Sequence, residues 1–137
     1  MIIQAETSEQ IEQARTLFRE YEAWLGVDLC FQNFEKELAN LPGKYAAPDG
    51  RLFLISVDDK IAGCIALRKI DDETCEMKRL FVREDFRGSG LGKTLIERLL
   101  SEAKEIGYER MLLDTLPDKM PKAVKLYESH GFHKIES

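Results

Sequence analysis

The sequence has few cysteines, and none is placed to form a cross-link or a metal site. Its three cysteines, Cys30, Cys64 and Cys75, are widely spaced, and no two form a C-x-x-C pair. An odd number without paired spacing argues against both a disulfide framework and a zinc site. We expect reduced, buried cysteines and no bound metal.

Long apolar runs are also missing. No stretch approaches the roughly 20 apolar residues that a membrane-spanning helix needs. Met1, Ile2 and Ile3 are followed at once by polar residues, including Glu6, with no basic leader, so no secretory signal is visible. We expect a cytoplasmic protein without a membrane partner.

A positive excess is the third absence. The chain has 20 Lys and Arg against 25 Asp and Glu, which gives a formal net charge of −5. Because nucleic-acid surfaces normally show a clustered excess of positive charge, we expect no nucleic-acid partner. Any anion that binds must be held by a local site.

The composition is otherwise that of an ordinary globular protein. Of 137 residues, 44% are hydrophobic and 33% are charged, which suits a single domain, residues 1–137, with a proper core. Residues 1–5 predict a short strand, and Thr7 and Gln10 have the capping-box spacing that begins a helix. The apolar residues that follow share one helix face: Ile11, Ala14, Leu17, Phe18, Tyr21 and Leu25. A second helix is predicted at residues 31–41, and a loop at residues 45–50.

From Arg51 the pattern becomes that of strands. Residues 51–57, 60–70 and 74–82 are rich in β-forming side chains, and the short polar links between them suit antiparallel hairpins. Residues 91–106 then have helical spacing, and another buried strand, "RMLLDTL", follows.

The order strand, helix, strand in this region predicts a β-α-β crossover. Such a connection makes its two strands parallel, so we expect a mixed, largely antiparallel sheet. A last helix near residues 120–127 and a short strand at residues 131–136 complete the predicted elements.

The stretch "RGSGLGKT", residues 87–94, resembles a phosphate-binding loop without matching the best-known one. A triphosphate loop reads G-x-x-x-x-G-K-[ST], and the position of its first glycine is occupied by Arg87. A dinucleotide fingerprint fails too, because its G-x-G-x-x-G spacing is absent. Glycines before a helix leave its first amides open to an anion, although a glycine-rich connection without a ligand is an equal alternative.

Arg87-x-x-Gly90-x-Gly92 matches the [RQ]-x-x-G-x-[GA] pyrophosphate motif of the GNAT superfamily of N-acetyltransferases. The preceding strand "EMKRLFV" and the later segments "LLDTL" and "AVKLYESHGF" are also similar to that family, so the resemblance covers nearly the whole chain. The resemblance implies a mixed α/β fold with helices on both faces of the sheet. It also implies an enzyme that transfers an acetyl group from acetyl-CoA to a primary amine in a ternary complex.

The resemblance assigns the coenzyme contacts. The main chain of Leu80, Phe81 and Val82 pairs with the pantetheine arm, and Arg87 starts the loop. The pyrophosphate is held by the amides of the loop: Gly88, Ser89, Gly90, Leu91, Gly92 and Lys93.

Two residues are the leading catalytic candidates. Tyr127 matches the tyrosine that many members place near the coenzyme sulfur as a proton donor, and a packed tyrosine is its structural alternative. Glu76 lies six residues before Val82, the offset of the glutamate base in the histone-modifying branch, and a solvated strand carboxylate is the alternative. The weaker candidates are His130, His133 and Asp114.

The acceptor site is expected after the first helix. Aromatic residues that could line a cleft are Tyr21, Trp24, Phe31, Phe34 and Tyr45. Packing in the core is the alternative for most of them and the better explanation for Phe34. Carboxylates that could meet a cationic amine are Glu22, Asp28 and Glu35.

Two departures from the family pattern leave an alternative function. Met120 stands where many members have an asparagine that contacts the coenzyme arm, and the chain ends at Ser137, where the family usually continues into a further strand. An open edge near residues 111–115 would favour a homodimer. Both departures are compatible with a non-catalytic sensor of acyl-CoA.

Overall fold

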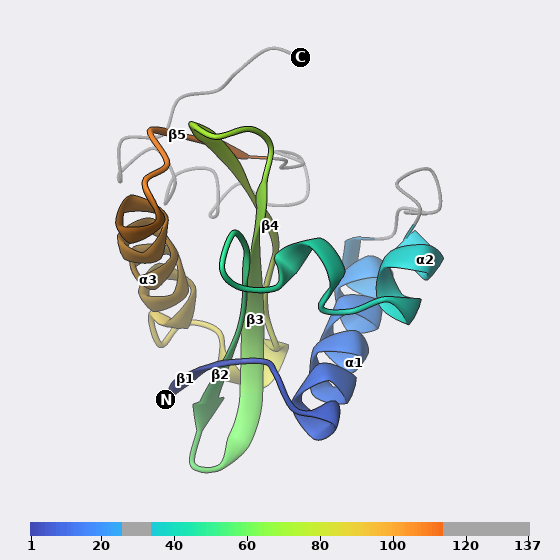
Figure 1. Cartoon of the computed structure of the whole chain (residues 1–137). Coiled ribbons are helices and arrows are strands. Elements are labelled where there is room, and N and C mark those ends of the chain that lie inside the picture. The colour runs from blue at the N-terminus through green and yellow to red at the C-terminus, as the bar shows by residue number, and fades with distance from the viewer. Residues whose placement is uncertain (26–33, 114–137) are drawn as a thin grey trace.

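The computed structural model describes residues 1–25 and 34–113 (Figure 1). The elements in these ranges are β1 (Ile2–Gln4), α1 (Ser8–Leu25), α2 (Phe34–Ala39), β2 (Arg51–Val57), β3 (Lys60–Lys69), β4 (Thr74–Val82), α3 (Leu91–Ile106) and β5 (Arg110–Leu113). Two short 3-10 helices, η2 (Gly43–Tyr45) and η3 (Glu84–Phe86), lie in the connections. The last helix and strand predicted from the sequence lie outside the described residues.

The strands form one mixed sheet in the order β1-β2-β3-β4-β5. Neighbours are antiparallel from β1 to β4, whereas β4 and β5 are parallel. Because α3 connects the two parallel strands, the predicted β-α-β crossover is confirmed.

The capping box at the start of α1 forms as the sequence predicts. Thr7 Oγ1 accepts a hydrogen bond from the main-chain N of Gln10 at 3.1 Å, and Gln10 Oε1 accepts one from the main-chain N of Thr7 at 3.1 Å. This reciprocal pair satisfies donors that the first turn of a helix otherwise leaves open. It fixes where the chain leaves β1 and enters the helix.

The strand and helix boundaries of the second half follow the sequence pattern closely. β2 and β4 coincide with the predicted runs, and β3 ends one residue early, at Lys69. Asp58 and Asp59 turn β2 into β3 with φ of +51° and +66°, the left-handed pair that a two-residue hairpin of type I′ needs. α3 stops at Gly107, whose φ of +112° suits a glycine after a helix.

The second helix is shorter where it is described. α2 covers Phe34–Ala39 within the predicted range 31–41, and residues 26–33 lie outside the described part. η2 takes the first residue of the predicted loop, Tyr45.

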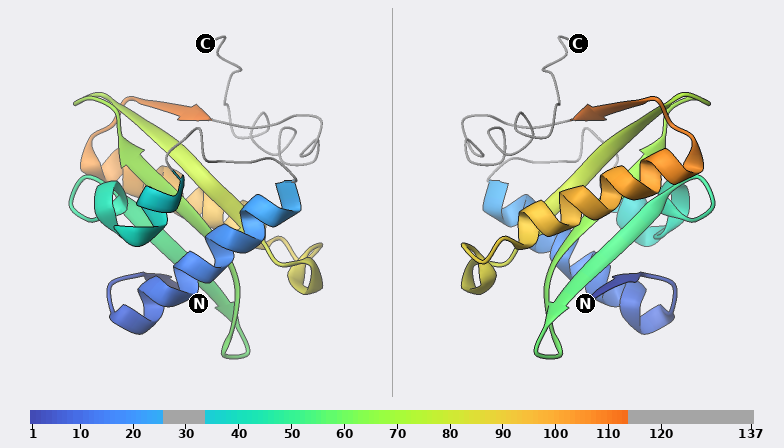
Figure 2. Two further views of the ribbon diagram at one scale, coloured as in Figure 1. Left: turned by 90° about the vertical axis from the view of Figure 1, so that its right-hand side faces the viewer. Right: turned by 90° about the vertical axis from the view of Figure 1, so that its left-hand side faces the viewer.

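Helices cover both faces of the sheet (Figure 2). α1 and α2 lie on one face and α3 lies on the other, as expected. We call the two cores that result the α1 core and the α3 core. The α1 core is built from buried residues that include Leu17, Phe18, Leu38, Leu54 and Phe81. The α3 core includes Phe53, Ile65, Met77, Leu95 and Leu99.

A β-bulge in β4 changes which residues face each core. The register between β3 and β4 shifts near Arg79, whose φ is +61°. Met77, before the bulge, packs in the α3 core, whereas Phe81 packs in the α1 core. Strict alternation would place both on one face. The bulge lets the Arg79 side chain reach Glu37 on α2.

Two of the three cysteines can be located. Cys64 and Cys75 are buried and free, as expected, and Cys30 lies outside the described residues. Within residues 1–25 and 34–113, no group of three or more His, Cys, Asp or Glu side chains is placed to hold a metal ion. No helix in those ranges is both long enough and apolar enough to span a bilayer.

Candidate active site

The loop from Arg87 to Lys93 follows η3 and opens α3. Gly88 and Gly90 have φ of +86° and +81°, a conformation that side chains with a β-carbon rarely adopt. Gly90 is the N-cap of α3, and its carbonyl accepts a hydrogen bond from the main-chain N of Thr94 at 3.1 Å. The two glycines therefore make the sharp entry into the helix possible.

The main-chain amides of this loop are left open. In the described part of the chain, the amides of residues 88–93 donate to no main-chain carbonyl. They lie at the N-terminal end of a 16-residue helix, where the helix dipole places roughly half a positive charge. Open donors backed by that dipole form an anion site, and phosphate is the usual occupant of such a site.

The Arg87 side chain folds back against the protein. Its Nε donates to the carbonyl of Val82 at 2.8 Å. Its guanidinium carbon lies 4.9 Å from the ring centre of Trp24 and 5.7 Å from that of Phe81. Such cation–π contacts favour one guanidinium position, so Arg87 ties the start of the loop to the end of β4.

Among the described residues, the end of β4 pairs with a strand on one side only. Leu80 packs in the α3 core, and Phe81 packs in the α1 core near Tyr21. β3 pairs with β4 on one edge, but β5 as described ends opposite Met77. Among the described residues, the opposite edge of Leu80, Phe81 and Val82 therefore faces no strand.

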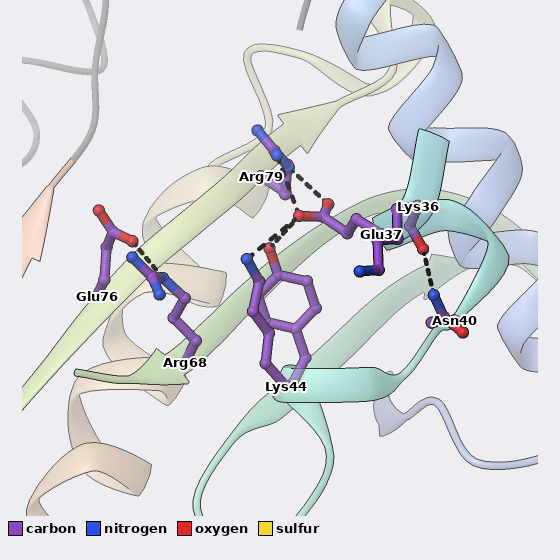
Figure 3. Close-up of polar contacts among 8 residues, drawn as sticks. Lys36, Glu37, Asn40, Lys44, Arg68, Glu76 and Arg79 are labelled. Carbon is purple, nitrogen blue, oxygen red and sulfur yellow. Dashed lines mark hydrogen bonds and ion pairs between the residues drawn. The ribbon is translucent and has the colours of Figure 1, made fainter. Parts of the chain in front are cut away.

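Glu76 is held by an arginine that sequence analysis did not single out. Arg68 on β3 is its cross-strand partner, and Arg68 Nε donates to Glu76 Oε1 at 2.5 Å (Figure 3). The side chains of Glu76 and Arg68 are 14% and 31% exposed. Opposite charges at paired positions of an antiparallel ladder would have been the signal, because such pairs stabilise a sheet.

A second arginine–glutamate pair is fully enclosed. Arg79 donates to both oxygens of Glu37, from Nε at 3.0 Å and from Nη2 at 3.2 Å. The two side chains are 3% and 6% exposed. Tyr45 Oη donates to Glu37 Oε1 at 2.9 Å, and Lys44 Nζ lies 3.7 Å from the same oxygen.

Tyr45 therefore belongs to the core, which was the alternative expected for most of these aromatic residues. Its side chain is completely buried and packs edge-to-face against Phe18. Burial and the neighbouring Glu37 raise the pKa of Tyr45 well above the usual range. The hydroxyl thus stays protonated and serves the buried carboxylate.

Lys78 lies on the same face of β4 as Glu76. It is buried, and its pKa is lowered by burial first and then by the positive charge of Arg79. Glu76 and Glu37 partly offset this shift, and Lys44 adds to it. The α1 side of β4 therefore carries a group of mutually coupled charges.

The other predicted acceptor residues lie in different surroundings. Tyr21 stacks on Trp24, whose ring lies beside Arg87 at the start of the loop. Glu35 forms an exposed ion pair with Arg19 at 3.2 Å. Glu22 is partly buried. Asp28, Phe31 and the Phe34 side chain lie outside the described part.

A pocket of about 250 Å³ lies between α2 and η2. It is lined by Lys36, Glu37, Asn40, Pro42, Gly43, Lys44 and Tyr45. Its walls come from two short segments within the region where the acceptor site was expected, and their relative placement depends on the turn at Pro42.

The remaining candidates from the sequence cannot be located. Tyr127, Asp114, His130, His133 and Met120 lie outside the described residues. The roles predicted for them rest on the sequence alone.

Comparison with known proteins identifies the family. Residues 11–132 match the model of the acetyltransferase (GNAT) family, so the chain belongs to this family of acyl-CoA-dependent N-acetyltransferases. An uncharacterized N-acetyltransferase of Dictyostelium discoideum is 36% identical, and the match covers 96% of this chain and 88% of the relative.

Solved structures agree with that assignment. An acetyltransferase from Streptococcus agalactiae 2603 has a TM-score of 0.81 at 27% identity, covering 99% of this chain and 84% of that chain. A GNAT family acetyltransferase from Elizabethkingia anophelis, solved with acetyl-CoA bound, has a TM-score of 0.59 at 30% identity, covering 64% of this chain and 57% of that one.

Proposed function

We propose that the protein transfers an acetyl group from acetyl-CoA to the primary amine of an acceptor by direct attack in a ternary complex. The observation that supports this most is the row of open amides at the start of α3, directly after β4. Such amides favour a phosphate group, and coenzyme A carries a pyrophosphate.

The coenzyme contacts follow from the loop and the strand edge. The pyrophosphate binds to the main-chain amides of residues 88–93, while Arg87 holds the loop in place. The amide groups of the pantetheine arm pair with the main chain of Leu80, Phe81 and Val82. This edge suits an extended ligand because it faces no described strand.

Acetyl transfer then has two proton problems. An amine with a pKa of about 10.4 is protonated at pH 7, and presenting it as a nucleophile costs about 4.6 kcal/mol unless a base assists. Glu76 is the proposed base, through the oxygen that Arg68 does not occupy. The coenzyme thiolate, with a pKa of about 8.5, needs a proton donor, and Tyr127 is the proposed one.

Two measurements test the proposal. Titration calorimetry with coenzyme A and with ATP tests which phosphate ligand the loop binds. We expect coenzyme A to bind and ATP not to bind. A thiol-release assay with acetyl-CoA and a panel of amines tests transfer, and we expect release that depends on the amine. Binding of ATP, or thiol release unaffected by every amine, contradicts the proposal.

A variant of the loop sharpens the calorimetric test. Gly90→Val introduces a branched side chain where φ is +81° and should weaken coenzyme A binding by at least about tenfold, because the loop must change its path. Gly107→Ala is a control at φ +112°, at the other end of α3, and should leave coenzyme affinity unchanged. The cytoplasmic location and the homodimer stay predictions from the sequence.

A further inference from the structure

The Arg68–Glu76 pair has hydrogen-bond donors and an acceptor that are still available to a ligand, whereas both carboxylate oxygens of Glu37 are already bonded to Arg79. Arg68 donates to Glu76 through Nε alone. Among the described residues, neither Nη atom of Arg68 has a hydrogen-bond partner, and Glu76 Oε2 accepts from no donor. Because the Arg68 side chain is 31% exposed, a small molecule can reach these groups.

Several cations among the described residues lie around this pair. Lys78 lies two residues after Glu76 on the same strand face. The positive charges of Arg79 and Lys44 act on Lys78 there, and the carboxylates of Glu76 and Glu37 act on it in the opposite sense. Arg68 acts on neighbouring Tyr45 in the same way. Cations gathered on one sheet face attract anions.

We propose that the acceptor is an α-amino acid or a close analogue, an amine with a carboxylate on the adjacent carbon. This inference rests on the proposed function and names its acceptor class. The two Nη groups of Arg68 bind the carboxylate as a fork, which is the geometry that guanidinium groups favour. Glu76 Oε2 accepts a hydrogen bond from the ammonium group of the same amino acid. The Arg68–Glu76 pair therefore binds both charged groups of the zwitterion.

Binding in this orientation is also compatible with acetyl transfer to the amine. The amine nitrogen attacks the thioester carbon, the new C–N bond forms and the C–S bond breaks. Of the two protons that the ammonium group loses, one passes to Glu76 and then to solvent. The other ends on the coenzyme thiol, for which Tyr127 is the proposed donor. The products are an N-acetylamino acid and free coenzyme A.

A purely cationic acceptor, such as a polyamine, fits the described residues less well. It would need carboxylates with free capacity, but Glu35 is paired with Arg19 and Glu37 is enclosed by Arg79 and Tyr45. Only Glu76 keeps an unused oxygen among these. A second cation beside Lys78 and Arg68 would be repelled.

Paired substrates test the inference on the intact protein. Thiol release from acetyl-CoA is measured with the common L-amino acids and with the carboxamide of each, which keeps the amine and removes the negative charge. For the preferred amino acid, kcat/KM should exceed that of its carboxamide by at least about 100-fold, because the amide leaves the Arg68 fork without an anion.

Variants assign this preference to Arg68. In Arg68→Gln the ratio of kcat/KM between acid and amide should fall at least about tenfold, mainly through a higher KM for the acid. Arg68→Lys keeps a charge without the fork and should retain an intermediate ratio. Arg98→Gln is the matched control, because Arg98 pairs with Glu102 on α3 at the opposite face and should leave the ratio unchanged.

The outcomes separate the inference from the proposed function. Equal use of amino acids and carboxamides, or an unchanged ratio in an Arg68→Gln protein that melts at the wild-type temperature, overturns the inference and leaves amine acetylation standing. Failure of the wild-type protein to bind coenzyme A overturns the proposed function, and the inference with it.

Discussion

Two arginine–glutamate pairs on the same face of the sheet have opposite character. Arg79 and Glu37 are both almost fully buried, and both carboxylate oxygens have partners. Arg68 and Glu76 share one hydrogen bond and keep free donors and a free oxygen among the described residues. A satisfied buried pair stabilises one structure, whereas an unsatisfied and accessible pair is available to a ligand. Burial and hydrogen bonding therefore mark Arg79–Glu37 as a structural pair and Arg68–Glu76 as a candidate functional pair, although both consist of the same two residue types.

The largest effect should come from breaking the buried pair. Glu37→Gln removes the carboxylate that binds the buried Arg79 guanidinium, and the free energy of unfolding should fall by about 3 kcal/mol or more. Urea unfolding followed by circular dichroism measures this. A loss below about 1 kcal/mol would mean that the pair is not structural.

Removing the charge of the accessible pair should change the rate more than the stability. We expect Glu76→Gln to lower kcat at neutral pH by about 100-fold, because the proposed base is lost. The free energy of unfolding should change by less than about 1 kcal/mol, since Arg68 keeps contact with solvent. A pH–rate profile identical to that of the wild type would remove Glu76 as the base.

Most of the fold could be predicted because its signals are local. The capping box of Thr7 and Gln10, the two-aspartate turn and the helix stop at Gly107 each depend on residues that are close in sequence. The spacing of apolar residues changes from every second residue to a helical spacing between β4 and α3, and this change predicted both elements. The parallel pairing of β4 and β5 followed from the order of elements.

The candidate site could be predicted only in part. The glycine loop and Glu76 were found from motifs, but Arg68 depends on strand register, which links positions that no local pattern joins. Arg79 was missed because the bulge overrides alternation, and alternation alone would place it beside Met77 in the α3 core. The burial of Tyr45 could not be predicted locally, because it depends on packing against residues distant in sequence, such as Phe18.

Tyr45 gives a smaller, pH-dependent test of the buried cluster. Because its pKa is raised in the folded state, the native protein keeps a proton that the unfolded chain loses above pH 10. The stability from this group is complete below pH 10 and is lost as the pH rises further. Between pH 10 and 11 the wild type should lose about 1 kcal/mol of unfolding free energy more than Tyr45→Phe. Parallel pH curves would refute the effect.

The smallest effect is expected at a third arginine–glutamate pair, which serves as the baseline for the other two. Arg19 and Glu35 meet at 3.2 Å with side chains 53% and 62% exposed. Water and salt screen such a pair, so Glu35→Gln should change the free energy of unfolding by less than about 0.5 kcal/mol. It should also leave the preference for amino acids over carboxamides intact, because Arg19 is paired at the surface rather than beside Glu76. A large change in that preference would move the acceptor site from β4 to α1 and α2, and the contrast between Arg68 and Arg79 would then lose its functional meaning.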